Sequence, residues 1–385
     1  MKIGLVGAPF APGKTGGTET LFRTLVASLN SYETGNEYLL YVWPQYVDHF
    51  QGLGPSFTVV PLGESWGLWD RARRKLFGAH DLTLRRLLAS QAVDLLHFPF
   101  TSIYPMGLPQ QKVLTFCDMQ QELLPAFFSS AELNHRKRTY RASVDEADHV
   151  IAISNYTKRT LIEYYEVPPE KVTTVYPTYD ERLFAGPRDR EWPWLAPYFF
   201  YPAACWPHKN HRRLLVAFRG VVDQYPKARL RLTGKIIPSA DASVRREIAE
   251  LGLGANVEFL GYVPYEDLPA LYQDAVALVF PSLFEGFGIP LLEAMAMGCP
   301  IACSNTTSLP EVGGDAAVYF NPRNEEEIGK TMLRLLADGS LRNALSSAGV
   351  ERVRKFSADR MAHGTVQAYA AVSSSGPSVG RAPSR

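Results

Sequence analysis

Short apolar runs alternate with longer amphipathic stretches along almost the whole chain. Such runs are typical of strands buried on both faces of a parallel sheet, and the stretches between them have the spacing of covering helices. The pattern predicts an α/β protein with two parallel sheets, each covered by helices. The expected strands are 3–7, 38–43, 57–62, 93–98, 112–117, 150–154 and 173–176 in a first series, and 199–202, 230–233, 257–260, 277–280 and 300–303 in a second.

The two series are separated by residues 185–197, where three prolines and mixed charges indicate a linker. The predicted domains are therefore residues 1–184 and 198–357. Residues 373–385 are rich in Ser, Gly and Pro and are expected to form a disordered tail. Between the second domain and this tail, the pattern predicts a helix over 358–372, with one face made of Met361, Thr365, Ala368, Tyr369 and Val372.

Composition narrows the class of protein. A net charge of +1 gives no general attraction to nucleic acid, and no nucleic-acid partner is expected. The four cysteines have neither metal-binding spacing nor the density of a disulfide scaffold, and no apolar run approaches the length of a membrane span. A cytoplasmic enzyme is the expectation.

The most informative stretch, 276–304, reads as strand, glycine turn, helix and strand. Gly286 and Gly288 let the backbone approach a ligand, and Pro290 suits the start of a helix whose N–H groups form an anion site. Glu285 precedes the glycines, and Glu293 is expected in the first turn of the helix. A phosphate held by backbone groups would leave both carboxylates to accept hydrogen bonds from neutral hydroxyls.

This segment, E-G-F-G-I-P-L-L-E, resembles the E-x7-E signature of the retaining glycosyltransferases of family 4. The resemblance implies the GT-B fold: two Rossmann-like domains facing across a cleft, an N-terminal acceptor domain and a C-terminal nucleotide-sugar donor domain, with the helix 358–372 crossing back to the first. It also implies that Glu293 holds the ribose hydroxyls. Glu285 and the backbone of Gly286, Phe287, Gly288 and Ile289 would hold the sugar and phosphates.

A second candidate is Lys209, which lies at a strand-to-helix corner just before a helix that Asn210 is expected to cap. A cation there can stabilise a diphosphate as it leaves. The family usually has an arginine a few residues earlier, where this chain has 204–206, Ala-Cys-Trp, so the phosphate clamp is either thinner or completed by Arg212. An exposed lysine near a helix start is the structural alternative.

Three further elements are implied by the resemblance. Gly16 and Gly17 would face the donor diphosphate, with a simple turn as the alternative; the preceding G-A-P-F-A-P-G-K-T lacks the spacing of an NTPase phosphate loop. Asp118 matches the family's His-Asp pair, but Cys117 replaces the histidine. In the last element, the backbone around Gly261 and Tyr262 is expected to hold the nucleobase. Gly234 is expected to open the same cleft, with an ordinary strand-end turn as the equal alternative.

Metal independence is expected because no D-x-D pair and no metal-binding Cys/His spacing occur, so no cofactor is predicted. Basic amphipathic segments at 69–90 and 135–141 allow peripheral contact with the anionic inner face of a membrane, and a solvated helix face explains them equally well.

The function predicted from the resemblance is transfer of a hexosyl group from a nucleotide-diphosphate sugar to a hydroxyl of a saccharide or lipid-linked saccharide. Surface-polysaccharide mannosyltransferases that use GDP-mannose are the first choice. Lys209, Glu285 and Asp118 are the predicted catalytic residues, and closure of the two domains is expected to bring them together. A sugar-nucleotide epimerase or hydrolase on the same fold, or a non-catalytic nucleotide-sugar-binding subunit, remains an alternative.

Overall fold

The computed structural model describes residues 1–13, 16–62, 82–184, 197–235 and 237–374. The chain forms two compact units: unit 1 consists of Met1–Tyr176 and the segment from Ala358 onward, and unit 2 consists of Pro177–Ser357. Unit 1 therefore ends eight residues before the predicted domain end at residue 184. The predicted linker, 185–197, lies almost entirely outside the described residues, and so does the tail after residue 374.

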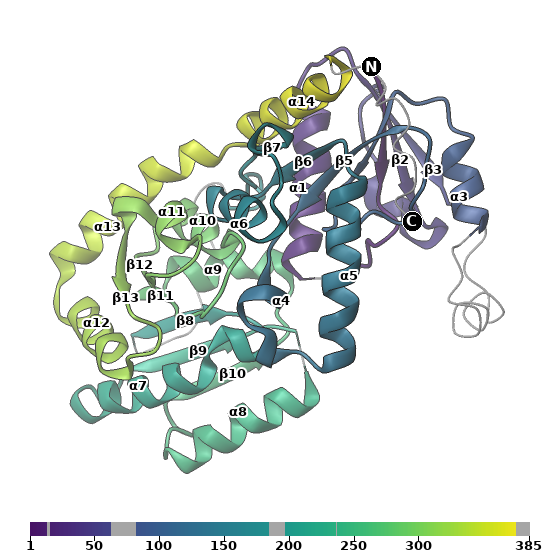
Figure 1. The fold of residues 1–385 in the computed structure, drawn as a ribbon. Helices are drawn as coiled ribbons and strands as arrows, with labels where there is room; N and C mark the ends of the chain where they lie inside the picture. Colours follow the sequence, from purple (N-terminus) through teal and green to yellow (C-terminus); the bar gives the residue numbers. More distant parts are fainter. Residues whose placement is uncertain (14–15, 63–81, 185–196, 236, 375–385) are drawn as a thin grey trace. The chain divides into compact units, whose positions relative to one another are not determined.

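Unit 1 contains a parallel sheet of the order β3-β2-β1-β4-β5-β6-β7 (Figure 1). The chain starts in the middle of the sheet, adds β2 and β3 on one side of β1, and then adds β4 to β7 on the other side. A parallel sheet with this strand order is doubly wound. The strands are β1 Lys2–Val6, β2 Glu37–Val42, β3 Phe57–Pro61, β4 Leu95–Phe98, β5 Gln111–Phe116, β6 His149–Ala152 and β7 Val172–Thr174. The described α-helices before unit 2 are α1 Gly17–Ser31, α3 Leu82–Ala89, α4 Gln120–Leu123, α5 Ser130–Glu146 and α6 Asn155–Tyr165, with 3-10 turns η1 Pro44–Phe50, η2 Pro125–Phe127 and η3 Pro169–Lys171.

The last helix, α14 (Ala358–Ser374), returns to unit 1 and packs beside α1 (Figure 1). Its predicted apolar face is confirmed, because all five side chains are buried. A buried polar contact is among those that hold it. His97 on β4 is fully buried, and its ring lies between the Tyr369 hydroxyl, 2.8 Å from Nδ1, and the Thr115 hydroxyl, 2.7 Å from Nε2. Residues far apart in sequence are thereby joined in one core.

Acid should destabilise unit 1 through His97. Burial lowers the pKa of this imidazole to about 3, whereas an unfolded histidine titrates near ~6.5. Between these values the unfolded chain binds a proton that the folded chain does not, so stability is full above pH ~6.5 and falls by about 1.4 kcal/mol per pH unit below it. Urea unfolding between pH 7.5 and pH 5 should show a smaller pH slope for His97→Asn than for the wild type.

Exposed His135 on α5 provides the matched control, and His135→Asn should keep the wild-type slope. Part of the pH slope should remain in His97→Asn because of His149. The pKa of His149 is also lowered by burial and, to a smaller extent, by Lys158 and Lys171. An unchanged slope in His97→Asn would show that this imidazole does not resist protonation in the fold.

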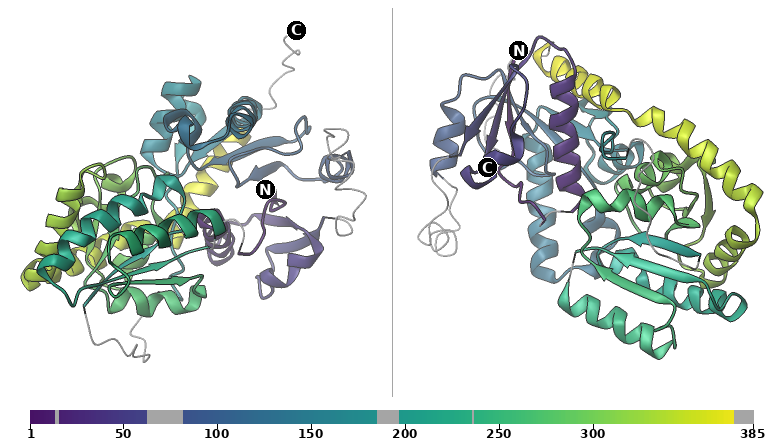
Figure 2. Two further views of the ribbon diagram at one scale, coloured as in Figure 1. Left: turned by 90° about the horizontal axis from the view of Figure 1, so that it is seen from below. Right: turned by 180° about the vertical axis from the view of Figure 1, so that it is seen from behind.

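Unit 2 contains a second parallel sheet, of the order β10-β9-β8-β11-β12-β13, with the same doubly wound plan. Helices lie on both faces of its sheet (Figure 2). The strands are β8 Tyr198–Pro202, β9 Arg229–Thr233, β10 Val257–Gly261, β11 Ala277–Phe280, β12 Ile301–Ser304 and β13 Ala317–Phe320. The helices are α7 His211–Gln224, α8 Pro238–Glu250, α9 Leu268–Gln273, α10 Ile289–Ala296, α11 Leu309–Gly313, α12 Glu325–Ala337 and α13 Gly339–Val353, with 3-10 turns η4 Pro207–Lys209, η5 Tyr265–Asp267, η6 Gly314–Ala316 and η7 Arg354–Phe356.

All twelve predicted strands correspond to strands of the structure, with ends that differ by up to two residues. The thirteenth, β13, was not predicted. It pairs only with β12 at the edge of the sheet, and its two central side chains are partly exposed. Its four residues, Ala-Val-Tyr-Phe, form a short apolar run that was not assigned to a strand.

Candidate active site in unit 2

In unit 2, the strands β9 and β10 lie on one side of β8, and β11 to β13 lie on its other side. In sheets of this type, ligands bind at the carboxyl ends of the two strands between which the strand order reverses. Here those strands are β8 and β11. The segment after β8 carries Lys209, and the segment after β11 carries Glu285. The topology therefore brings two predicted site residues to the position where a ligand is expected.

Lys209 and Glu285 form an ion pair, with Nζ donating to Oε1 over 2.6 Å. Their side chains are 19% and 13% exposed, so the pair is largely removed from water. The Lys209 ammonium also lies 5.6 Å from the centroid of the Phe280 ring. An anionic ligand at this point would meet the Lys209 ammonium, which the Glu285 carboxylate holds in place. The ion pair limits the conformational freedom of the lysine side chain before a ligand binds.

Backbone and side-chain contacts join the two segments that carry the pair. The Leu283 N–H donates to the His208 carbonyl over 2.8 Å, and the buried Tyr201 hydroxyl donates to the Lys209 carbonyl over 2.7 Å. The Asn210 side chain donates to the carbonyls of Pro281 and Pro322 at 3.0 and 2.7 Å. Sequence analysis missed these contacts.

The predicted cap at Asn210 is wrong. Asn210 occupies the position before α7, but its side chain makes no capping hydrogen bond and its backbone is left-handed, with φ 63°. Its amide instead joins three segments of unit 2, as described above. Asparagine tolerates this backbone region better than most residues, and that preference is the signal that could have indicated a turn.

The turn from Glu285 to Gly288 is braced by the segment that follows β12. The Glu285 N–H donates to Thr307 Oγ1 over 3.2 Å, and the buried Ser308 hydroxyl donates to the carbonyls of Glu285 and Phe287 at 3.0 and 2.8 Å. Gly288 has φ 115°, and a Cβ added there would lie 2.9 Å from Leu309. The turn is therefore fixed in shape and requires glycine at its last position.

Helix α10 begins directly after this turn. Gly288 is its N-terminal flanking residue, and as a glycine it has no side chain to cap the helix. The helix start thus keeps the polarity that favours an anion, beside the Lys209–Glu285 pair. The predicted position of Glu293 in the first turn is wrong, because Glu293 is the fifth residue of α10 and lies one turn further on.

Glu293 is 4% exposed, and both its oxygens accept hydrogen bonds. Tyr265 donates to Oε1 over 3.0 Å and Tyr272 donates to Oε2 over 2.6 Å. Burial raises the pKa of the Glu293 carboxyl, the two tyrosine donors lower it, and nearby Asp180 raises it. Sequence analysis identified Glu293 but not these three partners.

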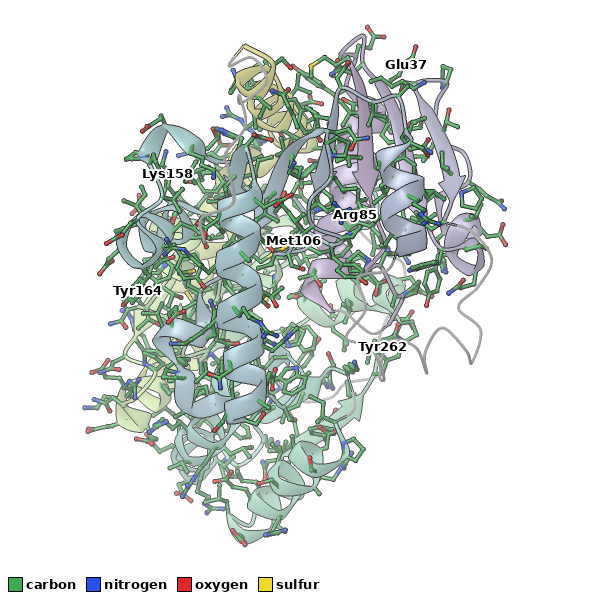
Figure 3. The ribbon with its side chains drawn as sticks, turned by 45° about the vertical axis from the view of Figure 1, so that its right-hand side comes forward. Glu37, Arg85, Met106, Lys158, Tyr164 and Tyr262 are labelled. Atoms are coloured by element: carbon green, nitrogen blue, oxygen red, sulfur yellow. The ribbon has the colours of Figure 1, made fainter. Side chains whose placement is uncertain are left out.

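The predicted nucleobase elements lie at the carboxyl ends of β9 and β10. The Gly234 N–H donates to the Gly261 carbonyl over 2.8 Å, and a Cβ at Gly234 would come within 2.5 Å of the Ala203 backbone. This close approach explains the glycine. Tyr262 is 61% exposed and lies at the surface of unit 2 (Figure 3).

Arg212 does not take the place of the missing arginine. Its guanidinium forms an ion pair with Glu247 on α8 over 3.1 Å, and its side chain is 84% exposed. Arg212 therefore pairs across the α7–α8 surface. Among the described residues, the cation that pairs with Glu285 is Lys209.

The remaining predicted residues lie in unit 1. Gly16, with φ 56°, precedes α1, Gly17 is its first residue, and the space where either would carry a Cβ is open. This geometry fits both the turn role and the approach of a ligand. Asp118 follows β5, and its Oδ1 accepts the Gln120 N–H over 3.0 Å.

Cys117 is buried, and burial raises the pKa of its thiol to about 12. Its N–H donates to Thr101 Oγ1, and its carbonyl accepts the Thr157 hydroxyl. A thiol that stays protonated at neutral pH is a poor nucleophile. Burial therefore argues against Cys117 as a nucleophile.

The predicted basic surfaces are only partly described. The residues up to 81 of the first basic segment lie outside the described residues, and Arg85 on α3 donates to the Gly107 carbonyl over 2.9 Å (Figure 3). On α5, three basic side chains pair with carboxylates, in the pairs Arg136–Glu132, Lys137–Glu122 and Arg141–Asp145. Among the helices that the structure describes, none is long and apolar enough to cross a bilayer.

Two family models match the chain and together cover most of it. The model described as Glycosyltransferase Family 4 matches residues 15–183, and the model described as Glycosyl transferases group 1 matches residues 190–352. The O-antigen chain mannosyltransferase B of Escherichia coli is 30% identical over 269 residues, which are 68% of this chain and 70% of that protein. The chain belongs to the family 4 glycosyltransferases.

A second sequence relative and two solved structures are also similar to this glycosyltransferase. The O-antigen chain mannosyltransferase RfbU of Salmonella typhimurium is 28% identical over 284 residues, 73% of this chain and 76% of its own. Among solved structures, sucrose-phosphate synthase from Thermosynechococcus elongatus has a TM-score of 0.77 at 20% identity and covers 97% of this chain and 100% of its own. Anabaena HepE in complex with UDP and glucose has a TM-score of 0.73 at 18% identity, with 96% and 99% covered. The predicted GT-B fold is confirmed.

Proposed function

We propose that this glycosyltransferase moves a mannosyl group from GDP-mannose to a hydroxyl of a saccharide or lipid-linked saccharide in surface-polysaccharide or glycolipid synthesis. The names of its relatives, two O-antigen chain mannosyltransferases, support the sugar and the kind of product. The observation that carries the proposal is the Lys209–Glu285 pair beside the start of α10 in unit 2. That arrangement suits a diphosphate bonded to a sugar.

Each part of the donor has a matching group in unit 2. The N–H groups at the start of α10 and the Lys209 ammonium offer positive charge to the diphosphate. Glu285 and the turn from Gly286 to Ile289 offer polar groups to the sugar hydroxyls. Glu293, one turn into α10, offers carboxylate oxygens to the ribose hydroxyls, as the family resemblance implies.

The proposed reaction breaks the bond between the anomeric carbon and the diphosphate oxygen and forms a bond to the acceptor oxygen. Negative charge grows on the departing diphosphate, and Lys209 stabilises it most when the charge is fully developed. The acceptor hydroxyl passes its proton to the departing diphosphate oxygen as it attacks, so the products are the glycoside and the nucleoside diphosphate. Retention of configuration is proposed from the resemblance, which also assigns Gly17 to the donor diphosphate and Asp118 to the catalytic residues.

The proposed reaction needs no metal. In the part of the chain that the structure describes, no group of three or more His, Cys, Asp or Glu side chains is arranged to hold a metal ion. The proposal therefore assigns the charge of the leaving diphosphate to Lys209 and the backbone. Activity that disappears in EDTA and returns only with a divalent cation would contradict this assignment.

Thermal unfolding with nucleoside diphosphates tests the donor site. GDP, UDP, ADP and dTDP are each added in EDTA at about a hundredfold excess over Kd, which stabilises the native state by about 2.7 kcal/mol. We expect GDP alone to raise the melting temperature, and Glu293→Gln to abolish the shift. A shift with UDP but not GDP would contradict the proposed donor.

Product analysis then tests the reaction. Incubation with GDP-mannose and membrane lipid extract of an O-antigen-producing bacterium should release GDP and yield a mannosylated lipid-linked saccharide. A changed sugar that stays attached to the nucleotide would identify an epimerase. Release of free mannose at the same rate with and without the extract would identify a hydrolase.

A further inference from the structure

Three side chains from separate segments of unit 2 surround the Glu293 carboxylate. Tyr272 lies on α9, Tyr265 begins η5, and Asp180 belongs to the segment that opens unit 2. The two tyrosines occupy different oxygens of Glu293. With 4% of its surface exposed, this glutamate has no room for a ribose in the described conformation. One of its covering groups must therefore move before a ribose hydroxyl can reach it.

Tyr272 is built into the core. It is fully buried, its ring lies edge-on to Phe200 of β8 at a centroid distance of 5.0 Å, and its hydroxyl is 2.6 Å from Glu293 Oε2. Displacing this ring would open a cavity beside the sheet, which is among the most destabilising changes a buried aromatic side chain can undergo. Tyr272 is therefore a fixed partner of Glu293.

Tyr265 is in a different position. It is only partly buried and follows Pro264 in a short surface segment in which Tyr262, Pro264 and Glu266 are exposed. Its hydroxyl bonds Glu293 Oε1 at a longer distance, 3.0 Å, and also bonds the backbone of Asp180. Its ring touches Phe184, with centroids 5.6 Å apart. Tyr265 can leave without disturbing the sheet.

We propose that Tyr272 is a positioning residue that holds Glu293 Oε2 throughout, while the Tyr265 hydroxyl occupies the place on Oε1 that a ribose hydroxyl of the donor takes. Donor binding then exchanges one hydroxyl donor for another, and Tyr265 sets the affinity by competing with the ribose. This inference rests on the proposed role of Glu293 in the donor site. The proposal predicts opposite changes in nucleotide affinity for Tyr265→Phe and Tyr272→Phe, although each substitution removes one tyrosine hydroxyl.

Titration calorimetry of Tyr265→Phe and Tyr272→Phe tests the proposal. GDP, UDP and ADP are each used with the 2′,3′-dideoxy counterpart, so the test does not depend on the assigned base. Removing the competing hydroxyl should make Tyr265→Phe bind its nucleotide about tenfold more tightly, and removing the fixed donor should make Tyr272→Phe bind about tenfold more weakly. Both changes should vanish with the dideoxynucleotide. The matched control is Tyr225→Phe, an exposed tyrosine of unit 2.

The pH dependence of binding separates positioning from general damage. The titratable groups that face Glu293 are Tyr265 from η5, Tyr272 from α9 and Asp180, and Cys299 faces Tyr272. Losing the Tyr272 donor removes an influence that lowers the pKa of Glu293. The affinity lost in Tyr272→Phe should therefore be partly regained as the pH is raised. A loss that is equal at every pH would overturn the positioning role.

The remaining outcomes are distinct. Tyr265→Phe binding that is weaker than wild type would show that Tyr265 stays on Glu293 beside the ribose, and would overturn the exchange alone. Wild-type protein that binds none of the nucleotides, or binds the ribo and dideoxy forms equally, would overturn the ribose-binding role of Glu293 in the proposed function, and the inference with it.

Discussion

Glu285→Ala is expected to lose at least ~10²-fold in turnover while the fold survives, in line with the loss of one preorganised polar group at a reaction centre. The carboxylate lies 2.6 Å from Lys209 in a turn that Thr307 and Ser308 hold in shape. The bracing contacts use the backbone of Glu285, so they remain when its side chain is removed. The variant therefore loses the contact to Lys209 and the proposed contact to the sugar but keeps the turn.

Turnover is measured as release of nucleoside diphosphate from the donor identified by the thermal screen. Circular dichroism and the melting temperature report on the fold. The control is Glu250→Ala, which removes an exposed carboxylate from the end of α8 and should leave turnover unchanged. Near-normal turnover in Glu285→Ala would remove this residue from the site.

Lys209→Met is expected to reduce turnover by about 10²–10³-fold, the range found when one donor to a developing negative charge is removed. Methionine keeps much of the length and apolar stem but not the ammonium. Because the positive charge matters most when the diphosphate departs, the loss should appear mainly in kcat, with a smaller effect on KM. Steady-state kinetics over a range of donor concentrations separates the two constants.

The control for Lys209→Met is Lys227→Met, at an exposed position before β9. A double-mutant cycle adds a second criterion, since Lys209 and Glu285 are direct partners. The double variant should lose much less than the product of the two single losses, because the second change removes a contact that the first has already broken. Fully multiplicative losses would show that the two side chains act independently.

Much of the fold follows from local pattern. Most of the twelve predicted strands are short runs of mainly apolar residues, and a run of this kind is visible in the sequence whatever surrounds it. β13 is also a short apolar run, Ala-Val-Tyr-Phe, and its place at the edge of the sheet beside β12 is known only from the structure. The anchoring of α14 by His97 and Tyr369, 272 positions apart, depends on a contact that no local pattern contains.

The candidate site divides in a similar way. Glu285, the glycines after it and the start of α10 lie within one short segment, so their local geometry could be predicted from spacing. The sequence also singled out Lys209 as a cation at a strand-to-helix corner. It did not pair that lysine with Glu285, since the two lie 76 positions apart and meet only because β8 and β11 are neighbours. Of the two alternatives for the missing arginine, a thinner clamp or completion by Arg212, the sequence could not choose, because the ion pair of Arg212 with Glu247 joins two different helices.

The sequence by itself thus determined the strands of the two α/β units and the glycine turn after Glu285, because each depends on residues close together in the chain. It also determined the membership of the family, through similarity that extends over residues 15–183 and 190–352. Only the tertiary structure decided what the acids of the candidate site contact. Glu285 faces Lys209, and Glu293 is buried between Tyr265 and Tyr272. Burial and hydrogen bonding set the charge and accessibility of a carboxylate, and both depend on neighbours that are distant in sequence.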